Sequence, residues 1–314
     1  MINRRLIRIK VFKVLYSSVF SDSFSLPEAE KELKVSCRQT LNLYYYVMNL
    51  MVALKRAAEV RVENGLRKFH PTDEELHPNL KFINNQFTDY LEKDEQFIKY
   101  CEKNGLLWSG DEAPMVRKML SDIYERDYFK EYMVSPDHSI AQDCELWSDI
   151  LASEIAENEE IEEILEEKSV YWMDDLTYVI NVVLKHIENF KTRKKLLFPD
   201  MFLKEDDREF AFRLLSLSLN HYHEYIDAVA SAVTNWDSDR IVATDTILMT
   251  QGLAEAVGFP EIPVKVTINE YVEISKFYST QNSRIFVNGL LDKLIQQFLS
   301  EGKIVKEGRG LRES

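Results

Sequence analysis

Residues 262–294 read IPVKVTINEYVEISKFYSTQNSRIFVNGLLDKL, and this stretch decides the fold class. Just before it, Gly258 is followed by Pro260, the usual pairing of a C-terminal glycine with a later proline, which predicts that a helix ends at Gly258. Thr267 and Glu270 have the spacing of a capping box, so we expect a new helix to start there. Ser283 can cap a last helix. That helix would carry an apolar stripe of Val287, Leu290, Leu291, Leu294 and Phe298.

The same helical periodicity extends outward through the rest of the chain. Apolar residues recur at helical spacing nearly everywhere, and strand-like alternation is scarce. We expect a first helix over residues 3–20, a second starting after Pro27, an uninterrupted helix-favouring run over 36–64 and one long helix over 205–235. The sequence therefore predicts an all-α protein.

Composition supports a globular, helical chain. Of its 314 residues, 45% are apolar, and only nine are glycine and eight proline, too few for linker-rich or β-sandwich architectures. The three cysteines lack CxxC spacing, which indicates reduced thiols rather than disulfides or a zinc site. No apolar run has membrane-spanning length and no signal-peptide cleavage pattern follows the basic start, so a cytoplasmic location is expected.

Charge is distributed unevenly. The formal net charge is -14, which disfavours nucleic-acid binding by the chain as a whole, yet residues 1–20 contain five basic side chains and no acidic one. Residues 137–175 hold fourteen acidic side chains. The acidic run at 157–167 is open to two interpretations, a docking surface for a basic partner or a solvated helix face. Phosphate-binding, zinc-hydrolase and serine-hydrolase motifs are absent, so we expect no catalytic residue, metal or cofactor.

The basic first helix suggests a ligand. At about 100° per residue, Arg4, Arg5 and Arg8 fall within one sector and would direct three guanidinium groups toward phosphates. The spacing leaves open a solvated helix end or intramolecular ion pairs with acidic residues.

Three blocks resemble one known family. The run at 262–294, the segment NWDSDRIVATDTIL at 235–248 and INRRLIRIKVFKVLY at 2–16 resemble, in order, signature segments of the NusB transcription antitermination family. The resemblance covers about 1–34 and 205–302. It implies a fold of two packed helical bundles, here with an inserted acidic helical domain at 35–204 and a flexible tail at 303–314.

The resemblance also implies a function. Members of the family bind single-stranded boxA RNA together with ribosomal protein S-ten (NusE), as non-enzymatic adaptors that help RNA polymerase resist termination and support rRNA transcription. Residues expected at the RNA are Arg4, Arg5, Arg8, Lys13, Tyr16, Asn282, Ser283, Arg284, Phe286 and Asn288. Asp245 is expected to face the S-ten partner. This assignment requires the arginines and the Asn282–Asn288 turn to lie close together.

Two other functions remain as alternatives. NusB-like domains also occur fused to RNA methyltransferases, although residues 35–204 lack a glycine-rich cofactor loop and a Pro-Cys motif. The acidic block could instead make the chain a scaffold for protein–protein contacts.

Overall fold

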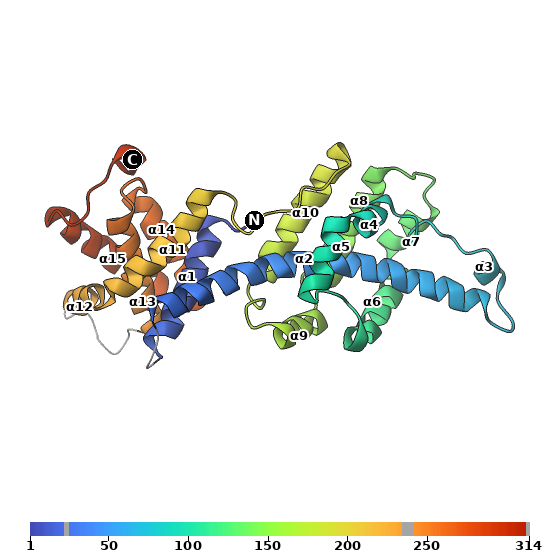
Figure 1. Cartoon of the computed structure of the whole chain (residues 1–314), viewed down its shortest axis with the longest axis horizontal. Coiled ribbons are helices and arrows are strands. Elements are labelled where there is room, and N and C mark those ends of the chain that lie inside the picture. The colour runs from blue at the N-terminus through green and yellow to red at the C-terminus, as the bar shows by residue number, and fades with distance from the viewer. Residues whose placement is uncertain (22–24, 234–241, 312–314) are drawn as a thin grey trace. The chain divides into compact units, whose positions relative to one another are not determined.

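The computed structural model describes residues 1–21, 25–233 and 242–311, and within them it confirms the all-α prediction. Fifteen α-helices are present in this part of the chain, and an isolated bridge between Ile2 and Phe202 is the sole β-type pairing. None of the described helices is long and apolar enough to cross a membrane. The chain divides into two compact units (Figure 1): unit 1 comprises Met1 and residues 38–201, and unit 2 comprises residues 2–37 and 202–314.

Unit 2 is built around one central helix. Helix α13 (Ala243–Gly258) packs against α1 (Arg4–Val19), α11 (Glu205–Asn220), α12 (Tyr222–Val233), α14 (Val264–Tyr278) and α15 (Ser283–Ser300). Its sequence, ATDTILMTQGLAEAVG, is mostly apolar or small, and most of its residues are buried, including the polar Asp245, Gln251 and Glu255. A helix with apolar residues on most of its sides has to be enclosed. Gly252 allows a close approach, because a Cβ there would lie 3.0 Å from a methyl group of Leu291.

Several helix boundaries differ from the sequence predictions. The end at Gly258 is confirmed, but α14 begins at Val264 after Pro263, so the capping box at Thr267 and Glu270 was wrong. Ser283 is the first residue of α15 rather than its cap, which is Asn282. The single helix expected over 205–235 is broken at His221 into α11 and α12.

The segment after Gly302 differs from the flexible tail that the sequence suggested. Ile304 is buried, the Lys306 ammonium donates to two main-chain carbonyls at the end of α13, and the Glu307 amide donates to the carbonyl of Pro260. Gly310 packs so closely against Pro260 that no Cβ would fit. Residues 303–311 are therefore held by specific contacts, which hydrophobic periodicity alone does not reveal.

Helix α2 (Leu26–Leu66) is one helix of 41 residues. The sequence suggested a domain boundary at residue 35, but the helix continues through that position. Its residues up to Cys37 belong to unit 2 and the others to unit 1. Helix-favouring residues throughout the run, with no interior proline or glycine before Gly65, explain why it does not end there.

Unit 1 is a separate helical assembly. Besides α2 it contains, in order, α3 (Asp73–Leu76), α4 (Gln86–Lys93), α5 (Glu95–Asn104), α6 (Ala113–Glu125), α7 (Asp127–Val134), α8 (Ile140–Ile150), α9 (Glu159–Lys168) and α10 (Leu176–Arg193). Its core is rich in aromatic rings, and two buried indole N–H groups have hydrogen-bond acceptors. The Trp147 indole donates to Asn85, and the Trp108 indole donates to the carbonyl of Tyr46, on whose ring it also stacks. Such pairing removes the cost of burying an indole N–H.

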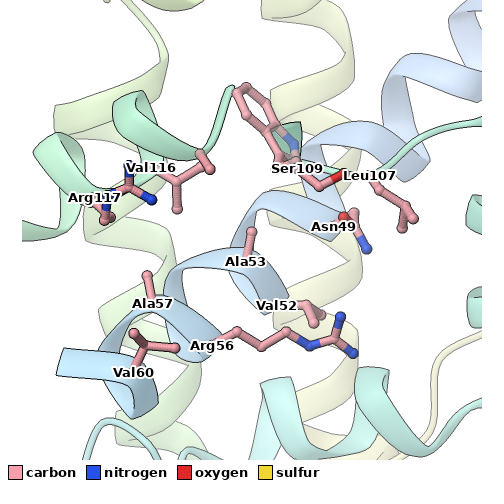
Figure 2. Close-up of a pocket in the computed structure, with 12 residues that line it drawn as sticks. Asn49, Val52, Ala53, Arg56, Ala57, Val60, Leu107, Ser109, Val116 and Arg117 are labelled. Carbon is pink, nitrogen blue, oxygen red and sulfur yellow. The ribbon is translucent and has the colours of Figure 1, made fainter. Parts of the chain in front are cut away.

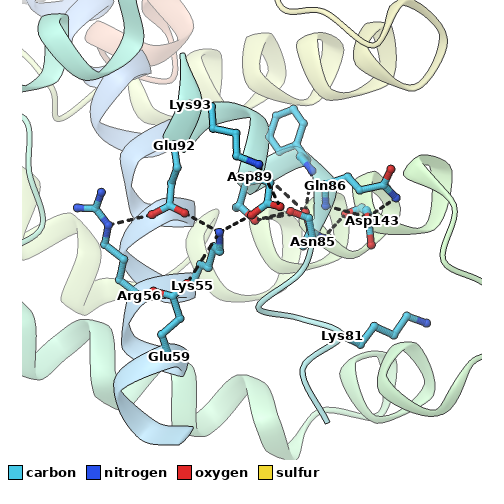
Figure 3. A network of polar contacts seen from close by, with 12 residues as sticks. Lys55, Arg56, Glu59, Lys81, Asn85, Gln86, Asp89, Glu92, Lys93 and Asp143 are labelled. Carbon is cyan, nitrogen blue, oxygen red and sulfur yellow. Dashed lines mark hydrogen bonds and ion pairs between the residues drawn. The ribbon is translucent and has the colours of Figure 1, made fainter. Parts of the chain in front are cut away.

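A buried lysine ties α2 to α4 within unit 1 (Figure 3). The Lys55 side chain is only 6% exposed, and its ammonium donates to both Asp89 and Glu92. Burial alone would lower the pKa of Lys55, but the hydrogen bonds to Asp89 and Glu92 outweigh burial and raise it. Glu92 also accepts from Arg56 at 2.9 Å. The acidic residues of this face are thus partly neutralised by a cation enclosed among them.

We expect Lys55→Met to lower the free energy of unfolding of unit 1 by about 1.5–3 kcal/mol, because two carboxylates lose a charged hydrogen-bond donor. The matched control is Lys93→Met, whose exposed ammonium lies 3.8 Å from Asp89 and should contribute about 0–1 kcal/mol. Urea unfolding, monitored through hydrogen exchange of the α4 amides, measures the effect of both substitutions. Equal effects of the two substitutions would show that burial of Lys55 has no energetic consequence.

Candidate nucleic-acid interface

Helix α1 carries the predicted cations of unit 2. The Asn3 side chain caps it by accepting the Leu6 amide at 2.8 Å, which starts the helix immediately before the arginines. The arginines do share one side of the helix, as their spacing indicates. That side is packed against other helices, however, and the structure places an acidic partner at each arginine.

Arg8 lies in the core of unit 2. Its guanidinium makes a bidentate pair with Glu255 of α13, with Nε–Oε2 and Nη2–Oε1 distances of 2.7 and 2.8 Å. The Arg8 side chain is 4% exposed and that of Glu255 is fully buried. The same carboxylate accepts from the hydroxyls of Thr267 and Tyr271. Burial opposes the charge of Arg8, but Glu255 prevails and raises its pKa.

The surface role expected for Arg8 therefore requires correction. Its guanidinium is enclosed and fully engaged, so it is not presented to a ligand in this structure. The sequence also allowed the arginines to form ion pairs within the protein, and Arg8 does so. Its partner is Glu255 of α13 rather than a residue of the acidic stretch. Thr267, expected to cap α14, instead helps to satisfy this buried carboxylate.

Arg4 and Arg5 are paired closer to the surface. Arg5 makes two hydrogen bonds of 2.9 and 2.7 Å with Glu270, and its side chain is 51% exposed. Arg4 contacts Asp207 of α11 at 3.1 Å, and its guanidinium lies over the ring of Phe210. A phosphate would have to compete with Glu270 or Asp207 for either arginine. Exposed pairs of this kind are weak enough for such exchange.

Glu270 should make the stability of unit 2 sensitive to acid. The hydrogen bond from Arg5 lowers the pKa of Glu270 from its ordinary 4.5, against the opposing effect of burial, and the charge of Arg8 lowers it further. A carboxylate with a lowered folded-state pKa stabilises the fold above its unfolded pKa and loses this contribution as pH falls through the folded value. We expect Glu270→Gln to cost stability at pH 7 and less at about pH 3.5. Urea unfolding at both pH values measures this, and a pH-independent difference would contradict it.

A second set of α1 side chains with exposed surface lies one to two turns after Arg8. Lys13 is half-buried, with its ammonium 5.4 Å from the centre of the Tyr278 ring, and Tyr16 is 38% exposed. The rings of Tyr278, Phe12, Tyr16 and Phe20 follow one another at centroid distances of 5.6, 6.2 and 4.8 Å. Phe20 is 60% exposed. A cation beside exposed aromatic rings has the chemistry for single-stranded nucleic acid, because phosphates and unstacked bases both find partners there.

The turn after Tyr278 lies next to this row along the chain. Its exposed side chains include Asn282 and Arg284, while Phe286 is half-buried and Asn288 is exposed on the next turn of α15. Ser283 is buried, so it supports the turn rather than presenting its hydroxyl. We call Lys13, Tyr16, Phe20, Tyr278 and residues 280–284 together the Lys13 face.

The buried side chain of Asp245 holds the turn around Ser283 in place. Its Oδ2 accepts from the Ser283 hydroxyl at 2.7 Å, and that hydroxyl also lies within 2.8–2.9 Å of the Thr280 and Ser279 hydroxyls. Asp245 is 1% exposed, and its Oδ1 has no hydrogen-bond partner among the described residues. A carboxylate near the start of α15 is favoured by the helix dipole. The expected contact between Asp245 and a protein partner is therefore corrected, since the side chain is enclosed and braces the turn.

The structure thus brings together only part of the predicted set. Lys13 contacts the ring of Tyr278, and Tyr16 joins the same row of rings through Phe12. Arg8 is enclosed, and Arg4 and Arg5 are held by acidic residues. The Asn282–Asn288 segment follows Tyr278 along the chain. Phe20 and Tyr278 were missed by sequence reasoning. The signal for Phe20 was the i, i+4 spacing of Phe12, Tyr16 and Phe20, which sets three rings along one line of a helix. No local spacing marks Tyr278, which ends α14. The first residues of the 235–248 segment, through 241, lie outside the described residues.

Comparison with known proteins relates one part of the chain, from α10 of unit 1 to α15 of unit 2, to a known family. Residues 183–296 match the model of the NusB family, and they include Asp245 and the Asn282–Asn288 segment. The chain is 33% identical over 121 residues to the transcription antitermination protein NusB of Chloroherpeton thalassium, covering 38% of this chain and 57% of that protein. It is 36% identical over 104 residues to NusB of Salinibacter ruber, covering 33% and 65%. Over 94 residues it is 36% identical to NusB of Methylacidiphilum infernorum, covering 30% and 66%.

The match to the NusB family therefore concerns residues 183–296, and the family model does not extend to the rest of the chain. It spans roughly three fifths of the length of these relatives. No solved structure matches the chain. Within the described residues, no group of three or more histidine, cysteine or acidic side chains is placed to hold a metal ion.

Proposed function

We propose that the protein is a non-enzymatic RNA-binding adaptor in transcription antitermination. In this proposal it binds single-stranded boxA-type RNA together with ribosomal protein S-ten (NusE), within an RNA polymerase antitermination complex in the cytoplasm, and supports rRNA transcription. The observation that carries it is the Lys13 face on a chain with a NusB-family domain. The relatives from Chloroherpeton thalassium and Salinibacter ruber are named as transcription antitermination proteins, which supports this process for the chain.

The Lys13 face has the composition that this role needs. Lys13 and Arg284 supply cations for the RNA backbone, Tyr16 and Phe20 supply rings for unstacked bases, and the Asn282 amide has both a donor and an acceptor for a base edge. The buried brace through Asp245 and Ser283 holds the turn in place before RNA arrives. Such preorganisation lowers the entropy cost of binding.

The Lys13 face as defined contains two cationic side chains, Lys13 and Arg284, which argues for a partner. Two phosphate contacts, from Lys13 and Arg284, predict a log–log salt slope of about -1.4 for single-stranded RNA. The formal net charge of -14 gives no long-range attraction to compensate. We therefore expect weak binding by the protein alone and a tighter ternary complex with S-ten.

The test is a fluorescence anisotropy titration of a labelled boxA-like RNA with the full chain, with and without purified S-ten protein. The proposal expects S-ten to raise the affinity at least tenfold and a scrambled RNA of equal length to bind more weakly. Unchanged affinity on adding S-ten, or equal binding of boxA-like and scrambled RNA, would refute it.

A further inference from the structure

Unit 1 contains an apolar groove that the proposed RNA-binding function does not use. It has a volume of about 290 Å³ and lies between α2, α6 and the segment that joins α5 to α6 (Figure 2). Along α2 its floor is formed by Asn49, Ala53, Ala57 and Val60, which recur at helical spacing over three turns. Ala53 and Ala57 are half-exposed and Val60 is 52% exposed. One face of α2 thus has the pattern of a packed interface but is not fully covered.

The opposite wall adds both apolar and basic groups. Leu107 and Val116 face α2 across the groove, and Arg117 lies at its edge (Figure 2). Within the described part of the chain, the Arg117 guanidinium makes no ion pair. Arg56 borders the groove from α2, bonded through Nε to Glu92 and 61% exposed. Two arginines therefore flank an apolar floor on a domain whose sequence is otherwise strongly acidic.

The groove also contains a polar group. Asn49 is 7% exposed, and its side chain lines the groove. A side-chain amide has both a donor and an acceptor to offer a bound peptide. Asn49 lines the groove together with Ala53, one turn along the same helix. The groove thus offers apolar contact, a hydrogen-bonding amide and positive charge.

We propose that this groove is a docking site for an amphipathic helix of a protein partner, which carries one or two acidic residues beside its apolar stripe. The small residues Ala53 and Ala57 allow a second helix to approach α2 closely, and apolar side chains at i, i+3 or i+4, and i+7 match three turns of α2. Acidic residues flanking that stripe pair with Arg117 and Arg56. Charge complementarity therefore sets the sign of the partner's flanking residues.

The groove fits a peptide better than other ligands. Its volume lies at the lower end of the range for small-molecule sites, while its floor extends over three helical turns, so side chains entering in a row use it more fully than one compact ligand. An RNA strand could pair its phosphates with the two arginines, but its bases also need aromatic rings to stack on. The one aromatic side chain that lines the groove is Trp108, which is 7% exposed. The proposal does not depend on RNA binding by unit 2.

The experiment selects peptides and then tests their charge. A phage library of random 16-residue peptides is selected on the full chain, and enriched peptides are titrated by fluorescence anisotropy. We expect peptides with a helical apolar stripe and flanking Asp or Glu. Ala57→Glu should weaken their binding at least tenfold, and Arg117→Glu about threefold to tenfold. Replacing the flanking acid by lysine should restore binding to the Arg117→Glu variant.

The control is Val134→Glu, which adds the same charge at an 83% exposed apolar position on α7 and should leave binding unchanged. If Ala57→Glu does not fold by circular dichroism, Val60→Glu at the exposed end of the floor replaces it. Enriched peptides that bind Ala57→Glu and the parent chain equally would overturn the proposal. So would self-association of the chain that Ala57→Glu abolishes, or RNA crosslinks mapping to the groove, since each names a different occupant.

Discussion

Replacing Glu255 with alanine is expected to destabilise unit 2 by about 3–5 kcal/mol, because it leaves the Arg8 guanidinium buried without its bidentate counter-charge. Glu255 has no exposed surface, and among the described residues Arg8 would keep Glu270, at 3.6 Å, as its acidic partner. The hydroxyls of Thr267 and Tyr271 would also lose their acceptor. The effect comes from the orphaned charge and donors more than from the net value of the pair, since ion pairs in cores are often close to neutral when compared with apolar residues.

The loss of stability from an unpaired Arg8 charge can be measured in unit 2 alone. Native-state hydrogen exchange of α13 and α14 measures the loss in unit 2 specifically, which matters because a chain of two units need not unfold in one step. The double variant Arg8→Met/Glu255→Leu should recover most of the stability. Arg5→Ala, at an exposed pair, should cost about 0–1 kcal/mol. A loss below 1 kcal/mol for Glu255→Ala would show that Arg8 can leave the core.

The variant Lys13→Glu/Tyr16→Ala is expected to weaken RNA binding at least tenfold in the presence of S-ten. Stacking of one base on an aromatic ring contributes about 1–3 kcal/mol, and 1.4 kcal/mol already corresponds to a factor of ten. Reversing the charge of Lys13 removes one phosphate contact and should make the salt slope shallower by about 0.7. Fluorescence anisotropy at several salt concentrations measures both quantities.

The matched control is Lys265→Glu, an exposed charge reversal in the first turn of α14, at the opposite end of that helix from Tyr278. It should leave both affinity and salt slope nearly unchanged. Thermal unfolding of each variant checks that the fold is intact. Equal losses from Lys265→Glu and from the Lys13 and Tyr16 variant would mean that RNA responds to total charge rather than to the Lys13 face.

Local signals in the sequence predicted the helices better than their ends. The apolar periodicity identified an all-α chain, and Gly258 with Pro260 marked the end of α13, because these effects depend on neighbouring residues. Thr267 and Glu270 matched a capping box by spacing, yet Thr267 donates to the buried carboxylate of Glu255. Glu270 pairs with Arg5 of α1, 265 residues away. A tertiary ion pair outweighed a local capping preference, and no local pattern reveals such a pair.

The candidate site was only partly predictable, because helix geometry is a local property and burial depends on distant parts of the chain. Helical geometry placed Arg4, Arg5 and Arg8 on one side of α1, but it did not show whether that side faces solvent or acidic residues. Asp245 was expected at the surface, and burial beneath the turn became visible only with α13 and α15 in place. The lysine and tyrosine further along α1 were identified from the family resemblance. Their aromatic neighbour Tyr278 comes from a distant part of the chain.

The most direct test of the central claim is photocrosslinking of a boxA-like RNA containing 4-thiouridine to the full chain with S-ten, followed by mass spectrometry of the protein. Our account predicts crosslinked peptides from residues 13–20 and 278–286, and their loss in the Lys13→Glu/Tyr16→Ala variant. Crosslinks confined to residues 38–201, or retained at full yield in that variant, would contradict RNA binding at the Lys13 face.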